Sequence, residues 1–181
     1  KGAVLGDGPV GDLTATLLKH IYGLDSARLK VFGAVAEKIA HFHFADCSMV
    51  QGFDFCSAEK VDVVIDCTGG RFSESALNQG IEILKRGGAL LLMGVSEEKV
   101  PINTRDILEK GLSLYGSSRS SIADFHAIIS AMQDMDYQQL LQSIVPEVHT
   151  SIRTVNDFKV AMDTAGQHKG WQRAILEFNW T

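Results

Sequence analysis

A glycine-rich segment near the start of the chain constrains the fold more than any other feature. Gly6, Gly8 and Gly11 have the spacing G-x-G-x-x-G. An apolar run, residues 3–5, precedes them, and residues 9–22 follow with apolar side chains at helical spacing. In this context the first glycine permits a tight turn, the second lets backbone approach a pyrophosphate, and the third lets the helix pack closely. The segment therefore predicts a strand, a phosphate-binding loop and a helix.

Pro9 opens the expected helix. Proline suits the first helical turn, because its missing N–H has no intrahelical partner there. The start of such a helix presents free N–H groups and the positive end of the helix dipole, both of which favour phosphate. A plain glycine-rich turn is the alternative interpretation. The flanking strand and helix favour the phosphate-binding one.

Strands alternate with helices along most of the chain. Apolar or β-branched runs predict five further strands, at residues 29–32, 47–50, 61–67, 89–95 and 112–115. Helical spacing predicts further helices at residues 37–42, 73–85, 104–110 and 122–135. We expect Gly87 and Gly88 to end the helix over residues 73–85. Two βαβαβ halves, starting near Ala3 and Val61, predict an α/β fold with a doubly wound, six-stranded parallel sheet, the Rossmann arrangement.

The last part of the chain has a different pattern. Residues 144–152, 155–165 and 173–178 predict a strand, a helix and a strand outside the six-stranded sheet. We therefore expect a dinucleotide-binding domain over residues 1–138 and a separate C-terminal segment over residues 139–181.

Composition excludes several classes of protein. The chain is 45% hydrophobic with a net charge of −5, which excludes disorder and argues against nucleic acid as a partner. It has no apolar run near the ~20 residues that cross a membrane. Its three cysteines form no C-x-x-C pair, as expected of free thiols in the cytoplasm. His41 and His43 lack partner ligands nearby in the sequence, so we predict no metal site there.

The end of the second strand bears on the choice of cofactor. Enzymes that use NAD usually carry Asp or Glu about 20 residues after the glycines, where it binds the ribose 2′-hydroxyl. Gly33 occupies that place here. Without the acid, one source of repulsion against a 2′-phosphate is lost, so NADP(H) is favoured over NAD(H). No arginine follows directly, and the nearest cation, Lys38, is better read as a solvated helix residue.

Two groups of segments resemble a known family. Residues 6–11 and 61–69 resemble the cofactor half of medium-chain, zinc-dependent alcohol and polyol dehydrogenases. Residues 92–97, 103–105 and 109–120 resemble the ribulose-5-phosphate reductases (ribitol-5-phosphate dehydrogenases) of teichoic acid and capsule synthesis. The resemblance implies hydride transfer between a nicotinamide and a sugar-phosphate carbonyl, with zinc as the Lewis acid.

The resemblance also bears on domain content. Members run to about twice this length, and their zinc ligands lie in a domain that precedes the glycine loop. The chain is then expected to be a cofactor domain with a C-terminal return into a missing catalytic domain, and to carry neither metal ligands nor catalytic residues of its own. The resemblance also implies a homodimer formed through the edge strand at residues 112–116. An open strand edge otherwise promotes aggregation.

The resemblance implies a set of cofactor-contacting residues, many of them acting through the backbone. They are Gly6, Gly8, Pro9, Val10, Gly11, Gly33, Thr68, Gly69, Val95, Ser117, Ser118 and Arg173. The glycine loop corresponds to the pyrophosphate site and Gly33 to the adenosine ribose, with Thr68 and Gly69 as the facing wall. Val95 corresponds to a backbone contact with the nicotinamide, and Ser117 and Ser118 correspond to a second backbone contact. Arg173 corresponds to a cation near the pyrophosphate. Close relatives carry a lysine where this chain has Ala34, which weakens the argument for NADP(H).

Other functions use similar elements. A regulatory domain that senses a nucleotide without catalysis would also carry the glycine loop, and so would a zinc dehydrogenase acting on another substrate. An S-adenosylmethionine methyltransferase is less favoured. Such enzymes carry acids in the first strand and at the end of the second, where this chain has residues 3–5 and Gly33.

Overall fold

The chain forms two compact units, Lys1–Ala127 and Ile128–Thr181. The computed structural model describes residues 1–167 and 172–179. The boundary between the units lies within a helix, α5 (Ile122–Ala131). The division into domains at residue 138 stays a prediction.

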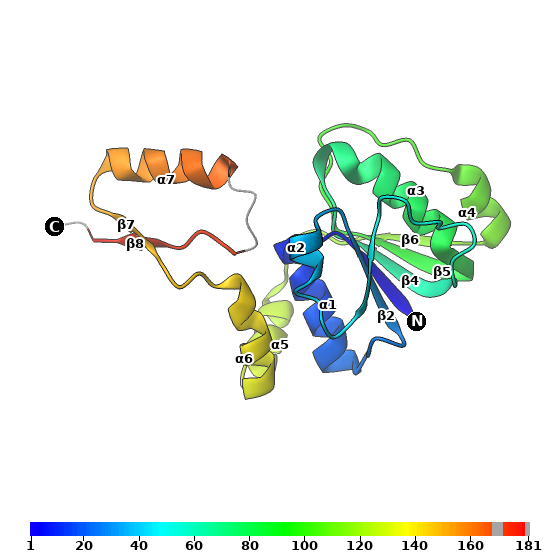
Figure 1. Cartoon of the computed structure of the whole chain (residues 1–181), viewed down its shortest axis with the longest axis horizontal. Coiled ribbons are helices and arrows are strands. Elements are labelled where there is room, and N and C mark those ends of the chain that lie inside the picture. Colours follow the sequence, from blue (N-terminus) through cyan, green and yellow to red (C-terminus); the bar gives the residue numbers. More distant parts are fainter. Residues whose placement is uncertain (168–171, 180–181) are drawn as a thin grey trace. The chain divides into compact units, whose positions relative to one another are not determined.

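The first unit contains a six-stranded sheet in which all paired strands are parallel (Figure 1). The strands are β1 (Gly2–Leu5), β2 (Leu29–Gly33), β3 (Asp46–Met49), β4 (Val61–Asp66), β5 (Leu84–Leu92) and β6 (Ser113–Gly116). Their order, β3-β2-β1-β4-β5-β6, places β1 between β2 and β4. This order confirms the doubly wound Rossmann prediction, and it puts the switch point at the carboxyl ends of β1 and β4.

Helices cover both faces of this sheet. One face carries α1 (Pro9–Tyr22) and α2 (Ala36–Ile39), and the other carries α3 (Ser73–Ile83) and α4 (Thr104–Lys110) (Figure 1). A short 3₁₀ turn, η1 (Gly70–Phe72), precedes α3. The predicted bounds of α1 are confirmed: Pro9 begins the helix, and Gly23 ends it in the left-handed conformation with φ of 60°.

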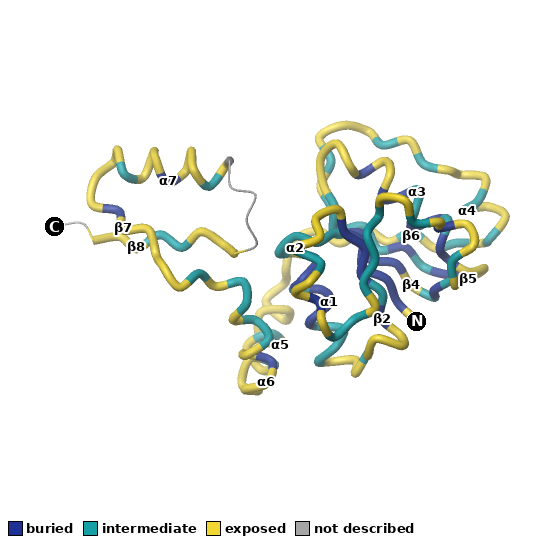
Figure 2. The backbone as a smooth tube through the Cα atoms, in the orientation of Figure 1, coloured by how far each residue is buried: buried dark blue, intermediate teal, exposed yellow. Residues whose placement is uncertain are grey.

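The core lies along the strands, as the dark blue stretches of Figure 2 show. Every residue of β1 is buried, as expected of a strand covered on both faces. The ring of Phe32 on β2 packs against Phe53 and Phe55 at centroid distances of 4.8 and 5.0 Å. Full burial of a side chain such as Phe32, which is 1% exposed, stabilises the fold by about 1.5–3 kcal/mol.

The glycine pair after α3 has a different role from the one predicted. The helix ends at Ile83, and β5 begins at Leu84 and runs through Gly87 and Gly88. Leu84 pairs with Val61 of β4, while Ala89 pairs with Val63, so the intervening residues form an irregular bulge. The φ of Gly87 is +73°, and a Cβ on Gly88 would lie 3.0 Å from the Asp62 carbonyl oxygen. The two glycines therefore permit this bulge and do not end the helix.

The second unit contains α6 (Met135–Leu141), the 3₁₀ turn η2 (Gln142–Ile144), β7 (Thr150–Ile152), α7 (Val155–Gln167) and β8 (Leu176–Phe178). β7 and β8 pair in parallel, which confirms the strand, helix and strand order of the tail. The single helix predicted over residues 122–135 is wrong. The Asp134 side chain accepts hydrogen bonds from the N–H groups of Asp136 and Tyr137, and thereby starts a new helix.

Among the described residues, no helix combines the length and the apolar character needed to cross a membrane.

Candidate functional site

The glycine loop leaves the sheet at the switch point. Gly6 adopts a φ of +120°, and its N–H donates to the Phe32 carbonyl of β2 at 2.8 Å. On the other side, the Cys67 N–H donates to the Leu5 carbonyl at 2.8 Å. A Cβ on Gly6 would lie 3.0 Å from the Cys67 carbonyl, so both space and conformation require glycine here. The loop is thus fixed between the carboxyl ends of β2 and β4.

The other two glycines of the motif have opposite surroundings. A Cβ on Gly11 would lie 2.0 Å from the Gly6 carbonyl oxygen, so α1 packs directly on the turn. A Cβ on Gly8 would meet no described atom within 4 Å, and Gly8 itself is extended. Among the described residues, no side chain caps the first turn, which Pro9 and Val10 begin. The start of α1 therefore keeps backbone N–H groups for an anion, with free space over Gly8.

The end of β2 holds a carboxylate that the sequence analysis missed. Gly33 is buried, and a Cβ there would lie 2.6 Å from both Cβ and Oδ2 of Asp7. Asp7 Oδ2 accepts hydrogen bonds from the N–H groups of Ala34 and Val35, each at 2.7 Å. The glycine loop thus supplies an acid to the place where the second strand lacks one. Two residues of the sequence together could have indicated this contact: an aspartate in the glycine loop, Asp7, and a glycine at the end of the second strand, Gly33.

The facing wall begins at the carboxyl end of β4. Asp66 is 2% exposed, and its carboxylate accepts hydrogen bonds from both the N–H and the hydroxyl of Thr68. Burial raises the pKa of Asp66, and the bonds from Thr68 partly oppose that rise. These bonds hold the turn after β4 in place, and this turn carries Thr68 and Gly69.

The segment after β5 lies against this turn. The Gly70 N–H donates to the Val95 carbonyl at 2.9 Å, and a Cβ on Gly69 would lie 3.1 Å from the same oxygen. The Gly94 N–H donates to the Asp66 carbonyl at 3.0 Å. The structure therefore brings Thr68, Gly69 and Val95 together, and Val95 is 79% exposed. Gly94, which permits this approach, was not among the predicted site residues.

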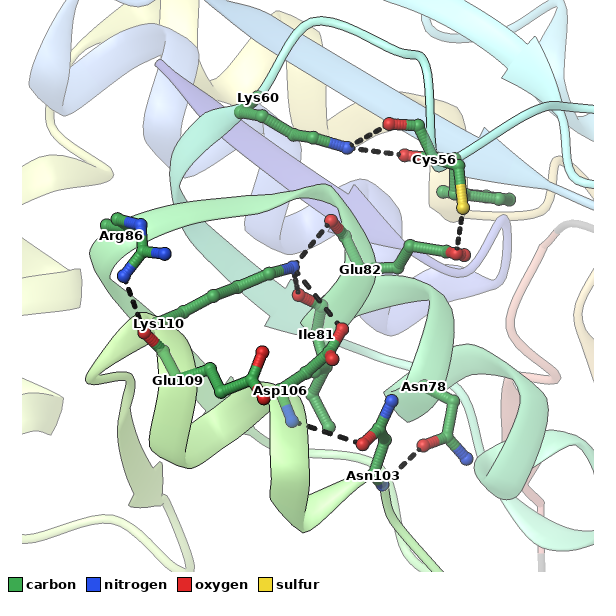
Figure 3. Close-up of polar contacts among 11 residues, drawn as sticks. Cys56, Lys60, Asn78, Ile81, Glu82, Arg86, Asn103, Asp106, Glu109 and Lys110 are labelled. Atoms are coloured by element: carbon green, nitrogen blue, oxygen red, sulfur yellow. Dashed lines mark hydrogen bonds and ion pairs between the residues drawn. The ribbon is translucent and has the colours of Figure 1, made fainter.

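Figure 3 shows how the far end of the same segment is anchored. The Asn103 N–H donates to Asn78 Oδ1 of α3 at 2.8 Å, and Asn103 Oδ1 accepts from the Asp106 N–H to cap α4. Lys110 Nζ donates to the Ile81 and Glu82 carbonyls at the end of α3, at 2.8 and 2.9 Å. These contacts fix α4 to α3, and so hold the chain that leads away from Val95.

The remaining predicted residues lie farther along the chain. Ser117 and Ser118 follow β6 and are exposed, and the Ser117 N–H donates to the Leu92 carbonyl of β5 at 3.0 Å. Arg173 belongs to the second compact unit, where its N–H donates to the Ile144 carbonyl at 2.9 Å. Its contact with a pyrophosphate stays a prediction. Within the described parts of the chain, no three His, Cys, Asp or Glu residues are grouped so that they could hold a metal ion.

Cys67 lies in this wall, and we expect it to be unreactive. Burial raises the pKa of its thiol to about 11, and the Asp66 carboxylate adds to the rise. At pH 8 the thiolate is then about a hundredfold scarcer than for an ordinary cysteine. Iodoacetamide should label Cys67 about a hundredfold more slowly in the folded chain than in urea, as measured by mass spectrometry. Equal rates in the two conditions would contradict this.

Comparisons with known proteins agree with the geometry. Residues 30–134 match the family described as zinc-binding dehydrogenase. Ribulose-5-phosphate reductase 1 of Staphylococcus aureus (strain NCTC 8325 / PS 47) is 34% identical, over 97% of this chain and 50% of that protein. The ribulose-5-phosphate reductase of Streptococcus pneumoniae (strain ATCC BAA-255 / R6) is 36% identical, over 86% of this chain and 44% of that protein. The chain spans about half the length of the curated relatives it matches.

A solved structure is similar over almost the whole chain. The crystal structure of S. aureus TarJ in complex with NADPH has a TM-score of 0.90 and 34% sequence identity. The match covers 98% of this chain and 55% of the TarJ chain.

Proposed function

The chain belongs to the zinc-binding dehydrogenase family, and on that premise we propose that it is the cofactor-binding portion of an NADP(H)-dependent reductase of ribulose 5-phosphate. The observation that carries this proposal is the start of α1. Backbone N–H groups are available there for an anion, and the space over Gly8 is free. The 34% sequence identity with a ribulose-5-phosphate reductase, over 97% of this chain, supports ribulose 5-phosphate as the substrate. The NADPH bound by the similar TarJ supports the cofactor.

The residues of this chain would bind and orient the dinucleotide. The loop from Gly6 to Gly11 holds the pyrophosphate through backbone N–H groups. The wall of Thr68 and Gly69 faces the adenosine side, and the backbone at Val95 holds the nicotinamide, with a second backbone contact at Ser117 and Ser118. The family resemblance alone assigns Arg173 a positive charge near the pyrophosphate. When bound, the nicotinamide supplies the hydride that reduces the sugar-phosphate carbonyl.

The zinc ion and the sugar-phosphate site are assigned to the half of the relatives that this chain does not match. That half would polarise the carbonyl, because zinc acts as a Lewis acid in such enzymes. The chain by itself is then expected to bind the cofactor without reducing the substrate.

A fluorescence titration of the 181-residue chain with NADPH and NADH tests the proposal. We expect NADPH to bind below millimolar concentration and more tightly than NADH. Absence of binding by both below millimolar would overturn the proposed function. Measurable reduction of ribulose 5-phosphate by this chain alone would contradict the assignment of the chemistry to the other half.

A homodimer through β6 is part of the same proposal. β6 is the last strand in the order of the sheet, and Tyr115 on it is 57% exposed. A charge on an edge strand opposes pairing with a second strand. We expect the parent chain to be dimeric by light scattering and Tyr115→Lys to be monomeric. Tyr22→Lys, a matched change at an exposed tyrosine of α1, should stay dimeric. A monomeric parent or a dimeric Tyr115→Lys would contradict this interface.

A further inference from the structure

Asp7 places a negative charge at the end of β2. Its Oδ2 accepts from the Ala34 and Val35 N–H groups, both at 2.7 Å. These are the first two backbone donors after the strand ends at Gly33. The carboxylate fits because residue 33 has no side chain: a Cβ there would lie 2.6 Å from Asp7 Oδ2. The geometry therefore depends on the pair of Asp7 and Gly33.

The end of the second strand is where a sheet of this kind distinguishes the two nicotinamide dinucleotides. An acid there suits the 2′-hydroxyl of NADH, and it repels the 2′-phosphate of NADPH. In this chain the acid comes from the glycine loop, and it engages two N–H groups that a 2′-phosphate could otherwise use. The turn itself, residues 33–36, contains no cation that would offset the charge.

We propose that Asp7 determines how strongly the site distinguishes NADPH from NADH, by restraining the affinity for the 2′-phosphate. This inference rests on the proposed function, because it assumes that a nicotinamide dinucleotide binds along the glycine loop. A carboxylate a few ångströms from a phosphate raises the free energy of the NADPH complex and has little effect on the uncharged 2′-hydroxyl of NADH.

The variant Asp7→Asn tests the inference, because it removes the charge and keeps an oxygen that can accept from Ala34 or Val35. We expect the ratio of the NADH to the NADPH dissociation constant, measured by fluorescence titration, to rise about tenfold. Asp25→Asn is the matched control. It changes the net charge equally, and Asp25 lies before β2, at the opposite end of the strand. Its ratio should equal that of the parent.

A second pair of probes locates the effect. Adenosine 2′,5′-bisphosphate carries the 2′-phosphate, and adenosine 5′-monophosphate does not. We expect Asp7→Asn to bind adenosine 2′,5′-bisphosphate more tightly than the parent chain does. It should bind adenosine 5′-monophosphate with the same affinity as the parent. Should circular dichroism show that Asp7→Asn is unfolded, Asp7→Ser, which also lacks the charge, takes its place in both measurements.

The outcomes separate this inference from the proposed function. An unchanged or lower ratio in the folded variant overturns the role of Asp7 and leaves the proposed function standing. An equal gain in affinity for NADH and NADPH also overturns the role of Asp7, because the charge then does not act specifically on the 2′-phosphate. Binding of neither dinucleotide by the parent chain overturns both.

Discussion

Replacing Gly94 with alanine is expected to lower the free energy of unfolding by about 3 kcal/mol or more. A Cβ at this position would lie 1.5 Å from the Thr68 carbonyl oxygen and 2.7 Å from Asp66 Oδ2. The first of these atoms is backbone, so no side-chain rotation relieves the contact. The Gly94 N–H also donates to the Asp66 carbonyl at 3.0 Å, which ties the two segments together. The turn after β4 and the segment after β5 must therefore move apart.

Urea denaturation followed by circular dichroism measures this effect. Most surface substitutions change stability by less than about 0.5 kcal/mol. Gly116→Ala is the matched control, because its Cβ would meet no described atom within 4 Å. We expect a clear fall in the denaturation midpoint for Gly94→Ala and almost none for Gly116→Ala. Equal midpoints for Gly94→Ala and the parent would show that the backbone relaxes easily, against the close approach described.

The first strand, the loop and α1 could be predicted from sequence because their signals are local. Pro9 begins the helix and Gly23 ends it, so both bounds follow from residues next to the helix ends. The doubly wound parallel sheet could be predicted from the alternation of strands and helices, since right-handed crossovers leave few arrangements. Family resemblance then added residues such as Val95, whose place beside Gly69 no local pattern indicates.

The features that were missed depend on contacts between distant segments. Gly94 lies in an apolar run, and only the position of Thr68 shows why it must be glycine. Gly87 and Gly88 have the composition of a helix stop, but pairing with β4 makes them a bulge. Asp7 occupies a variable position of the G-x-G-x-x-G pattern, so the pattern itself does not single it out. Its role depends on the space that Gly33 leaves, which is a tertiary property.

Gly8→Val is expected to leave the fold intact and abolish tight cofactor binding. Gly8 is extended, with φ of −86° and ψ of 179°, and a Cβ there would meet no described atom within 4 Å. The valine would instead fill the space over the start of α1, where the pyrophosphate is proposed to accept backbone hydrogen bonds.

Loss of two hydrogen bonds to a charged group should weaken NADPH binding by roughly a hundredfold or more. Fluorescence titration measures the affinity, and thermal unfolding by circular dichroism should show a midpoint close to that of the parent. The matched control is Gly166→Val in α7, where a Cβ also meets no described atom within 4 Å. This control should bind NADPH as the parent does. Unchanged affinity in a folded Gly8→Val would place the pyrophosphate elsewhere, because a side chain at Gly8 and a phosphate at the start of α1 compete for the same space.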